Sequence, residues 1–365
     1  MSASVLVKLL LLEEARRIDM LRRRRKRFKI RSLRQLSTDK DYIRIYRLNF
    51  ELIKDLEHDL AQYLPPEPSR SDGVDNRTKI LCALSFLANG SYQKRISRNV
   101  NTYLSQPSAS RAIRAVVNAL AHPGFVKKHI RLPHNVNERS YVKERFFKKF
   151  HIPDILGCID SFFVTMVRPK EDDEQFNCGE GYHSRKLTII TDSDLNILYV
   201  DVKHGGATQA NFIFENSTIR THLEKLTNEG ETLYLLGDSK YTQRPYVMTP
   251  YSNPKTDAQK HYNKLHNTAK NTAEKTYKVL KARFKSLLVH RVFHYDPDMV
   301  AKIATACCVL HNICNRSGLP VPSLEEDLRK REIGVLNKLK QNRSNDLDEE
   351  CRFRDELVDR LWCER

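Results

Sequence analysis

Three acidic residues lie within or beside apolar segments of the sequence, where a carboxylate needs a polar or cationic partner. Asp160 interrupts the apolar run 155–164, and burying an ionised carboxylate there alone would cost several kcal/mol. Asp238 closes the run 233–237, at the end of a predicted strand, where sheets of this kind place functional groups. Glu274 borders the apolar stripe of a predicted helix. Together these residues predict a set of acids that converges in the fold.

Three acids from two strands and a helix suit chemistry at a phosphodiester. In such reactions two Mg²⁺ ions about 4 Å apart activate the nucleophile and stabilise the leaving oxygen, and Mg²⁺ takes hard oxygen ligands while keeping several waters. Cysteine and histidine ligands are not required. A structural role is open to each acid as well: Asp160 on the solvent face of an edge strand, Asp238 as a turn former, and Glu274 in an ion pair with Lys278.

Basic residues surround the third acid. Phosphate contacts from such residues add affinity but little sequence information. We expect these contacts from side chains on or near the predicted helix of Glu274, namely Lys270, Lys278, Lys281 and Arg283, with Lys285 beside them.

The charge of the whole chain points to the same class of partner. Its 365 residues carry 63 Lys and Arg against 45 Asp and Glu, a formal charge of +18, and a field of that sign attracts polyanions. Residues 16–34 concentrate this charge. Within them a run of six basic residues is typical of a nuclear address or a phosphate-binding arm, or else of a solvated basic helix face: Arg22, Arg23, Arg24, Arg25, Lys26 and Arg27.

Other features lead us to expect neither a membrane protein nor a secreted one. The apolar run 5–12 is shorter than the ~20 residues that span a bilayer, and no signal peptide is expected because it lacks a basic region before it and a small-residue cleavage site after it. The eight cysteines form no CxxC pair and are expected to be reduced thiols in the cytosol or nucleus.

A zinc site is a separate alternative near the end of the folded region. Cys307, His311 and Cys314 are spaced by four and three residues, which places them on one helical face, as zinc ligands would be. The surrounding stretch 303–313 is apolar enough for a core helix, and buried cysteine is common in cores. We therefore favour packing over zinc binding.

The elements before the first acid are expected to be helical. Apolar residues recur at helical spacing over 42–64, and a proline-rich linker follows at 65–69. The next helix is predicted to begin near residue 79 and to end at Asn89-Gly90, a C-cap signal.

Two further helices are predicted before residue 121, and they suggest a DNA reader. A short helix at 91–100 precedes one that opens at Ser105, a fitting N-cap, with Pro107 in its first turn. The later helix carries Arg111 and Arg114 on its polar face. The pair fits a helix-turn-helix whose second helix enters a major groove, and a plain helical subdomain with exposed arginines is the alternative.

From residue 154 the period changes to that of strands. Strands are predicted over 155–167 and 232–236, and a hairpin over 187–202 with its turn at 191–194. Helices are predicted over 260–288 and 298–315. This order indicates an α/β or α+β fold with helices packed on a sheet. The last forty or so residues alternate charges and lack a strong apolar stripe, so we expect them to be partly disordered.

Several motifs resemble the Harbinger (PIF-type) transposases, and above all the domesticated harbinger transposase-derived nucleases of animals. Their order and spacing match from about residue 78 to 315, around two-thirds of the chain. The motifs are Gly157-Cys158-Ile159-Asp160, Gly181-Tyr182-His183-Ser184, Leu235-Leu236-Gly237-Asp238-Ser239, Met248-Thr249-Pro250, Tyr262-Asn263 with His266, Glu274-Lys275-Thr276, Leu280-Lys281-Ala282-Arg283-Phe284, and the run from Ala306 to Ile313.

The resemblance implies an RNase H-like nuclease core with Asp160, Asp238 and Glu274 as the DDE acids, which would be the catalytic residues and the ligands of Mg²⁺ or Mn²⁺. It implies DNA as the substrate, a Myb/SANT-like accessory protein, and a place in the nucleus and also the cytoplasm. Self-association is left open. We expect a basic leader at 1–40, a helical region at 41–150 with the helix-turn-helix at about 78–121, the nuclease domain at 151–318, and a charged tail at 319–365.

One departure from the family pattern keeps a second function open. The family usually follows its third strand with Gly-Ser-x-x-Asp, whose aspartate is often counted as a further metal ligand, but here residues 206–210 end in Ala210, which offers no oxygen. Ser161 also replaces a common glycine, and Lys270 stands where arginine is frequent. The alternative to a nuclease is therefore a catalytically inactive, domesticated transposase that acts as a nuclear DNA-binding or recruitment protein.

Overall fold

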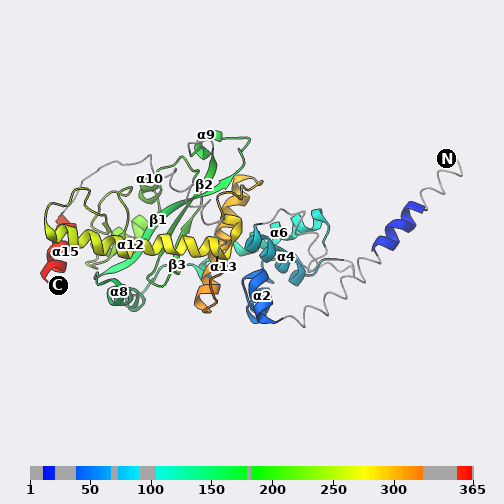
Figure 1. Ribbon diagram of the computed structural model, residues 1–365, viewed down its shortest axis with the longest axis horizontal. Helices are drawn as coiled ribbons and strands as arrows, with labels where there is room; N and C mark the ends of the chain where they lie inside the picture. Colours follow the sequence, from blue (N-terminus) through cyan, green and yellow to red (C-terminus); the bar gives the residue numbers. More distant parts are fainter. Residues whose placement is uncertain are drawn as a thin grey trace. The chain divides into compact units, whose positions relative to one another are not determined.

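The computed structural model (Figure 1) describes residues 11–20, 38–66, 73–90, 104–178, 182–323 and 352–363. The basic run at 22–27 and the predicted helix at 91–100 lie outside these residues. The chain forms two compact units, Met1–Ala119 and Leu120–Arg365. In the described part of the chain, the helices are all too short or too polar to cross a membrane.

The first unit is helical, as predicted, with one correction. It includes the helices α2 (Asp39–Tyr46), α3 (Phe50–Leu60), α4 (Asn76–Asn89) and most of α6 (Gln106–Leu120). The helix predicted over 42–64 is two helices, because Arg47 adopts a left-handed backbone (φ 68°) that ends α2. The side chain of Asn49 then accepts a hydrogen bond from the amide of Leu52 and caps the start of α3.

The predicted helix caps of this unit are confirmed. Gly90 ends α4 in a left-handed conformation (φ 59°), which glycine adopts at little cost. The Ser105 hydroxyl accepts the amide of Ser108 at 3.3 Å and starts α6. Arg111 and Arg114 are exposed on α6. The helix-turn-helix stays a prediction, since its first helix is not described.

The second unit is built on a mixed sheet in the order β3-β2-β1-β4-β5. β1, β2 and β3 form an antiparallel meander, and β4 and β5 run parallel to β1. The predicted hairpin between β2 and β3 is confirmed, and the Asp192 carboxylate closes it by accepting the amides of Asp194 and Asn196, both at 2.8 Å. The strands are β1 (Ile155–Met166), β2 (His183–Thr191), β3 (Ile197–Asp201), β4 (Tyr234–Leu236) and β5 (Val247–Met248).

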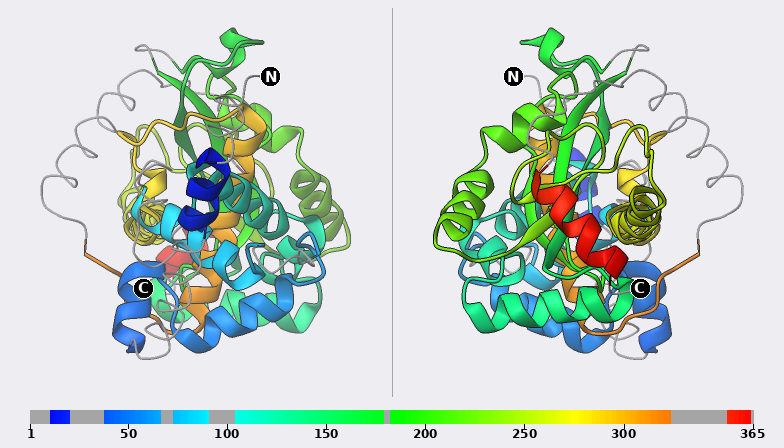
Figure 2. Two further views of the ribbon diagram at one scale, coloured as in Figure 1. Left: turned by 90° about the vertical axis from the view of Figure 1, so that its right-hand side faces the viewer. Right: turned by 90° about the vertical axis from the view of Figure 1, so that its left-hand side faces the viewer.

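Helices cover both faces of this sheet, and Figure 2 shows it between them. One apolar cluster joins β1 and β2 to α10 and α11, and a second joins β1, β4 and β5 to α8, α12 and α15. The helices are α7 (Pro123–His129), α8 (Val136–Phe150), α9 (Asp173–Phe176), α10 (Ala210–Glu215), α11 (Thr218–Asn228), α12 (Asp257–Arg283), the 3-10 helix η1 (Lys285–Leu287), α13 (Pro297–Arg316) and α15 (Arg352–Cys363).

This architecture confirms the expected fold class, a mixed α/β domain preceded by a helical region. Helices α7 and α8, which we grouped with the helical region, lie in the second unit.

The C-terminal prediction is corrected for residues 352–363, because α15 is a packed helix. Its residues Leu357, Val358 and Leu361 are buried in one apolar cluster with Tyr262 and Ala269 of α12.

Candidate active site

The sheet topology places two of the three acids at one end of neighbouring strands. Asp160 lies within β1, and Asp238 is the second residue after β4. The register pairs Cys158 with Leu236, so each aspartate lies two residues beyond the same rung of this parallel pair. Helix α12 packs against β1, β4 and β5 and carries Glu274.

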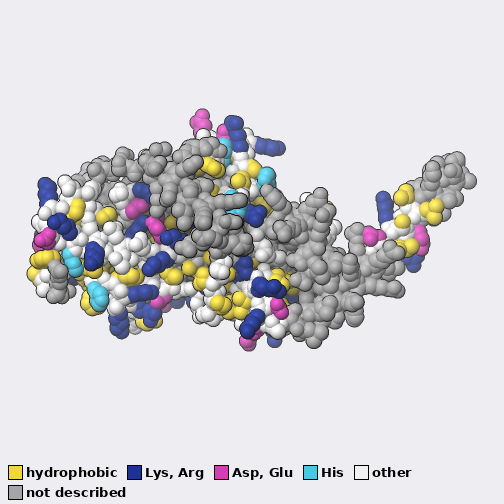
Figure 3. Space-filling view, in the orientation of Figure 1, with side chains coloured by type: hydrophobic (Ala, Val, Ile, Leu, Met, Phe, Trp, Pro, Cys, Tyr) yellow, Lys and Arg dark blue, Asp and Glu magenta, His cyan; other side chains and the backbone are white. Residues whose placement is uncertain are grey.

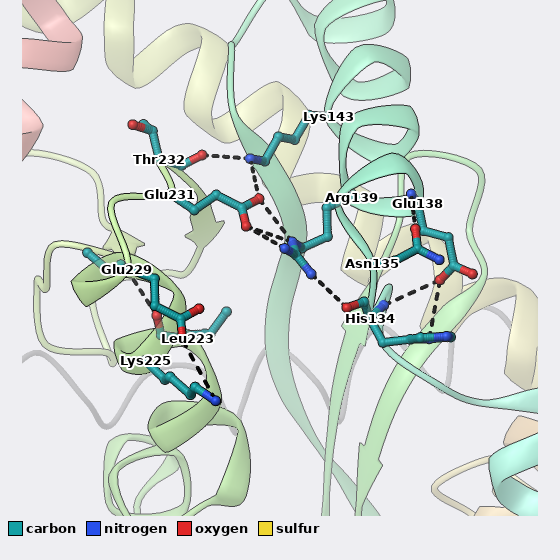
Figure 4. Close-up of polar contacts among 11 residues, drawn as sticks. His134, Asn135, Glu138, Arg139, Lys143, Leu223, Lys225, Glu229, Glu231 and Thr232 are labelled. Carbon is teal, nitrogen blue, oxygen red and sulfur yellow. Dashed lines mark hydrogen bonds and ion pairs between the residues drawn. The ribbon is translucent and has the colours of Figure 1, made fainter.

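A polar network fixes where β4 begins (Figure 4). Arg139 of α8 donates through Nε to both carboxylate oxygens of Glu231, each at 2.9 Å, and Lys143 donates to Glu231 at 2.9 Å and to the carbonyl of Thr232 at 2.7 Å. The hydrogen bond from Arg139 holds the pKa of Glu231 below its ordinary value. This ion pair ties α8 to the segment that leads through β4 to Asp238.

Lys270 brings the two aspartates together. Its ammonium lies 2.8 Å from Oδ2 of Asp160 and 3.7 Å from Oδ2 of Asp238. Lys240 adds a second cation at 3.0 Å from Oδ2 of Asp238. Asp160 and Lys270 are both buried, so this is a low-dielectric site where an unpaired charge would be costly. The solvent-face alternative for Asp160 is wrong.

The electrostatics of the site follow from burial and from these ammonium groups. Burial raises the pKa of Asp160, and Lys270 acts against that shift. Burial has the same upward effect at Asp238, but Lys240 and Lys270 outweigh it and lower the pKa of Asp238. For Lys270 burial acts downward, yet Asp160, Asp238 and Glu274 raise its pKa above the ordinary value. Lys270 is therefore charged at neutral pH.

Glu274 lies beside this pair on α12, one turn beyond Lys270, and is half-buried. Its carboxylate is 3.8 Å from the ammonium of Lys278, so the predicted ion pair is present. Among the residues that the structure describes, no three His, Cys, Asp or Glu side chains are gathered closely enough to hold one metal ion. The structure thus brings Asp160 and Asp238 together at Lys270, with Glu274 one turn further along α12.

The two aspartates nevertheless fit a divalent cation. They offer the hard carboxylate oxygens that Mg²⁺ and Mn²⁺ prefer, and they already share a cationic group, the ammonium of Lys270. Asp238 also has the predicted turn role, since its carboxylate accepts the amide of Lys240 at 3.1 Å. That turn leaves its second oxygen directed at the two ammonium groups.

A hydroxyl network that sequence reasoning missed lies among residues close to the aspartates in the sequence. The Ser161 hydroxyl lies 2.8 Å from Oγ1 of Thr188 and 3.1 Å from the hydroxyl of Tyr241. Tyr241 also packs against Gly237, where a Cβ would lie 3.0 Å from its ring. Ser161 and Tyr241 follow the two aspartates by one and three residues, and that proximity in sequence was the available signal.

The structure corrects three of the predicted phosphate contacts. Lys270, Lys281 and Arg283 are buried. The Lys281 ammonium lies 4.3 Å from the centre of the Tyr277 ring, and Arg283 donates to the carbonyls of His311 and Leu319 at 3.3 and 3.1 Å. Lys278 is exposed on α12.

The set considered for zinc packs in the core. Cys307, His311 and Cys314 are all buried. The His311 ring places Nε2 2.8 Å from the carbonyl of Leu195 and Nδ1 3.3 Å from the Arg283 guanidinium. These contacts occupy both ring nitrogens, as expected of a packing histidine.

Ala210 lies in the apolar core, at the first position of α10. It is buried in the cluster that contains Ile159 and Tyr241. The next residue, Asn211, exchanges hydrogen bonds of 2.9 and 3.0 Å with Thr242. Position 210 therefore contributes a methyl group to packing beneath the site, where the family pattern has an acid.

Comparison with known proteins shows what the second unit resembles. Residues 159–312 match the family model described as a DDE superfamily endonuclease, a span that holds Asp160, Asp238 and Glu274. This part of the chain is therefore similar to the DDE superfamily endonucleases. No solved structure matches the chain.

The relatives confirm the resemblance to harbinger transposase-derived nucleases. The chain is 28% identical over 285 residues to the human protein named "Putative nuclease HARBI1", covering 78% of this chain and 80% of that one. It is 29% identical over 256 residues to the Xenopus laevis protein of the same name, covering 70% and 72%. An Arabidopsis thaliana "Protein ALP1-like" is 27% identical over 199 residues, covering 51% of this chain and 48% of that one.

Proposed function

We propose that this protein is a transposase-derived DNA endonuclease that depends on a divalent metal, Mg²⁺ or Mn²⁺. The observation that carries the proposal is the meeting of Asp160 and Asp238 at the Lys270 ammonium, inside a domain that matches DDE endonucleases. When bound, a metal ion would lower the pKa of a water molecule and polarise the phosphodiester. Asp160 and Asp238 would hold the metal, with Glu274 completing the set.

Lys270 has a defined part in this proposal. Its ammonium acts against the upward effect of burial on the pKa of Asp160 and helps to lower the pKa of Asp238. It also holds the two carboxylates close together, which two bare carboxylates would resist through mutual repulsion. Exchange of that ammonium for a metal ion would leave the charge of the site compensated. Lys270 would then leave the position between Asp160 and Asp238, and the two carboxylates would keep their arrangement.

DNA binding and nuclear entry belong to the same proposal. Lys278 on α12 and Arg111 and Arg114 on α6 are exposed, and each can contact phosphates. The basic run at 22–27 would act as a nuclear address or a phosphate-binding arm. A Myb/SANT-like accessory protein would help with entry and recognition, as the resemblance implies.

The inactive alternative is favoured by specific observations. Ala210 is packed in the apolar core, and the described residues hold no ready three-ligand metal cluster. A protein with this site that never exchanges Lys270 for a metal would still bind DNA through its basic side chains. It would act as a DNA-binding or recruitment protein.

Nicking of a supercoiled plasmid separates the two functions. Wild-type protein should nick with Mg²⁺ or Mn²⁺ and not with EDTA. Asp160→Asn and Glu274→Gln should each lose about 100-fold or more, since every 1.4 kcal/mol lost from transition-state stabilisation costs about tenfold in rate. The control is Asp257→Asn, which removes an exposed acid from the first turn of the same helix and should nick like wild type.

The assay is run with and without a Myb-like partner, and DNA binding is measured in parallel. Wild type and Glu274→Gln that bind DNA equally and nick nothing in any condition would reject the nuclease. That result would leave recruitment as the function.

A further inference from the structure

The C-terminal helix α15 contacts the helix that carries Glu274. Its apolar residues Leu357, Val358 and Leu361 are buried against Tyr262 and Ala269 of α12. These contacts lie in the half of α12 that precedes Lys270, and Figure 1 shows α15 at that end of the helix. Because removing three aliphatic side chains from water is favourable, this burial holds α15 against α12.

Arg354 connects α15 to the segment that follows β5. Its side chain is buried, and Nη1 lies 3.3 Å from Oγ1 of Thr249 and 3.4 Å from the carbonyl of Pro250. The guanidinium also stacks on Tyr251, 3.8 Å from the ring centre. Burying a charged arginine is costly unless such acceptors and an aromatic face surround it, so this contact is specific.

Thr249 is one residue from the backbone that positions Asp238. The carbonyl of Met248 accepts the amide of Gly237 at 3.0 Å and lies 3.0 Å from Nε2 of His266. Gly237 precedes Asp238, and His266 lies one turn before Lys270 on α12. The segment that Arg354 holds is therefore bonded both to the residue before Asp238 and to the helix of Glu274.

A second arginine of α15 reaches the strand that carries Asp160. Arg360 forms an ion pair with Asp154 at 2.9 Å. Asp154 directly precedes β1, has a left-handed backbone (φ 62°) and accepts the amide of Tyr234 from β4 at 2.8 Å through its carbonyl. This contact ties α15 to the start of the β1–β4 pair, whose far end carries the two aspartates.

We propose that α15 is a clasp that positions the three acid-bearing elements of the nuclease, and that Arg354 is its main positioning residue. The kinetic test of this inference rests on the proposed nuclease function. The hydrogen-exchange test rests on the structure alone. Arg354 touches no acid of the candidate site. It acts through Thr249, Met248 and Gly237 on Asp238, and through His266 on the helix of Glu274.

The test uses full-length Arg354→Met, with Arg354→Lys as the conservative variant. Arg352→Met is the matched control, because Arg352 lies on the same helix, is exposed and pairs with Glu356 at 3.0 Å. Amide hydrogen exchange is measured over 237–251 and 257–283. Arg354→Met should exchange faster in both segments, Arg354→Lys should recover part of the protection by reaching one acceptor, and Arg352→Met should match wild type.

Nicking kinetics give the second readout. Arg354→Met should lower kcat by about tenfold or more without changing KM for DNA, because small misplacements of reacting groups cost up to about 100-fold and α15 contributes no proposed DNA contact. Arg360→Met, which removes a half-buried ion pair, is the milder variant if Arg354→Met folds poorly. It should raise exchange around 154–160.

The outcomes distinguish the clasp from the nuclease itself. Wild type that never nicks removes the nuclease, while the exchange measurements still decide the clasp. Exchange in Arg354→Met and Arg360→Met equal to that in Arg352→Met would overturn the clasp. So would a loss of nicking that disappears when rates are corrected for the unfolded fraction, because α15 would then provide stability alone.

Discussion

At the scale of single residues, Lys270 determines the state of the site. Its ammonium lies between Asp160 and Asp238, and a charged group removed from such a buried set leaves its partners uncompensated. The sequence could indicate that acids converge here, because each one stood at an unfavourable position for a lone charge. It could not show that a lysine joins them, since a lysine on a helix is equally suited to solvent.

Replacement of Lys270 should expose this balance. Lys270→Met leaves the buried Asp160 and the half-buried Asp238 without their shared ammonium, so we expect the free energy of unfolding to fall by about 3–5 kcal/mol at neutral pH. Added Mn²⁺ should raise the Tm of this variant more than that of wild type, as the ion no longer competes with the ammonium. Thermal unfolding with and without Mn²⁺ measures both effects. Lys264→Met, at an exposed position of α12, should behave like wild type; equal Mn²⁺ shifts in all three proteins would contradict this account.

Two buried histidines should make the fold sensitive to acid. Burial lowers the pKa of His266 to about 4 and that of His311 to about 3, whereas an unfolded histidine titrates near 6.5. Below pH 6.5 these two histidines bind protons in the unfolded chain but not in the folded chain. Stability is therefore complete above pH 6.5 and should fall by about 1.4 kcal/mol per pH unit per histidine down to about pH 4.

Urea unfolding at pH 7 and pH 5 checks this sign. His266→Gln should show a smaller loss between the two pH values than wild type, although it begins less stable. His58→Gln, at an exposed position of α3, should keep the full pH dependence. A wild-type stability that is flat across this range would rule out the titration of buried histidine.

At the scale of elements, the sequence predicted correctly those features that depend on neighbouring residues. The hairpin, β1, α12, α13 and the caps at Gly90 and Ser105 were correct because alternation, helical periodicity and capping are written into neighbouring residues. The break at Arg47 was missed because a non-glycine residue takes the left-handed conformation there. β5 and α15 were missed because a two-residue strand and a highly charged helix gain their order from tertiary contacts. The burial of Lys281 and Arg283 was missed for the same reason, because it too depends on tertiary contacts.

The ion pair between α8 and the start of β4 gives a prediction at this scale. Arg139→Met removes the hydrogen bonds to Glu231 and should lower stability by about 1–3 kcal/mol, the cost of leaving a partly buried carboxylate short of a donor. The double variant Arg139→Met with Glu231→Gln should be less destabilised than the sum of the single changes. Lys148→Met serves as control, since Lys148 is exposed on the same helix. Additive effects in urea unfolding would mean that the pair is not coupled.

At the scale of the whole molecule, charge is distributed unevenly. On the face drawn in Figure 3, Lys and Arg side chains of the second unit are interspersed with Asp and Glu. The basic run at 22–27 instead holds six basic residues in a row within a chain of net charge +18. Long-range attraction to DNA should therefore depend strongly on that run, while the proposed chemistry belongs to the second unit.

Neutralising the run tests this division. Replacing Arg22, Arg23, Arg24, Arg25, Lys26 and Arg27 by Gln should flatten the slope of log K against log salt by about 0.9 for each phosphate that the run neutralises in wild type. It should also reduce nuclear accumulation. Fluorescence anisotropy across a salt series and imaging of a tagged protein measure the two effects. An unchanged slope and unchanged distribution would reject both roles of the run.

The order of the acids along the chain has a consequence for biosynthesis. Asp160 emerges from the ribosome first, Asp238 later, Glu274 later still, and α15 after all of them. If α15 positions the acids as proposed, a chain whose synthesis stops before residue 352 would lack the assembled centre. Under the proposed nuclease function, such incomplete products would not cleave nucleic acid.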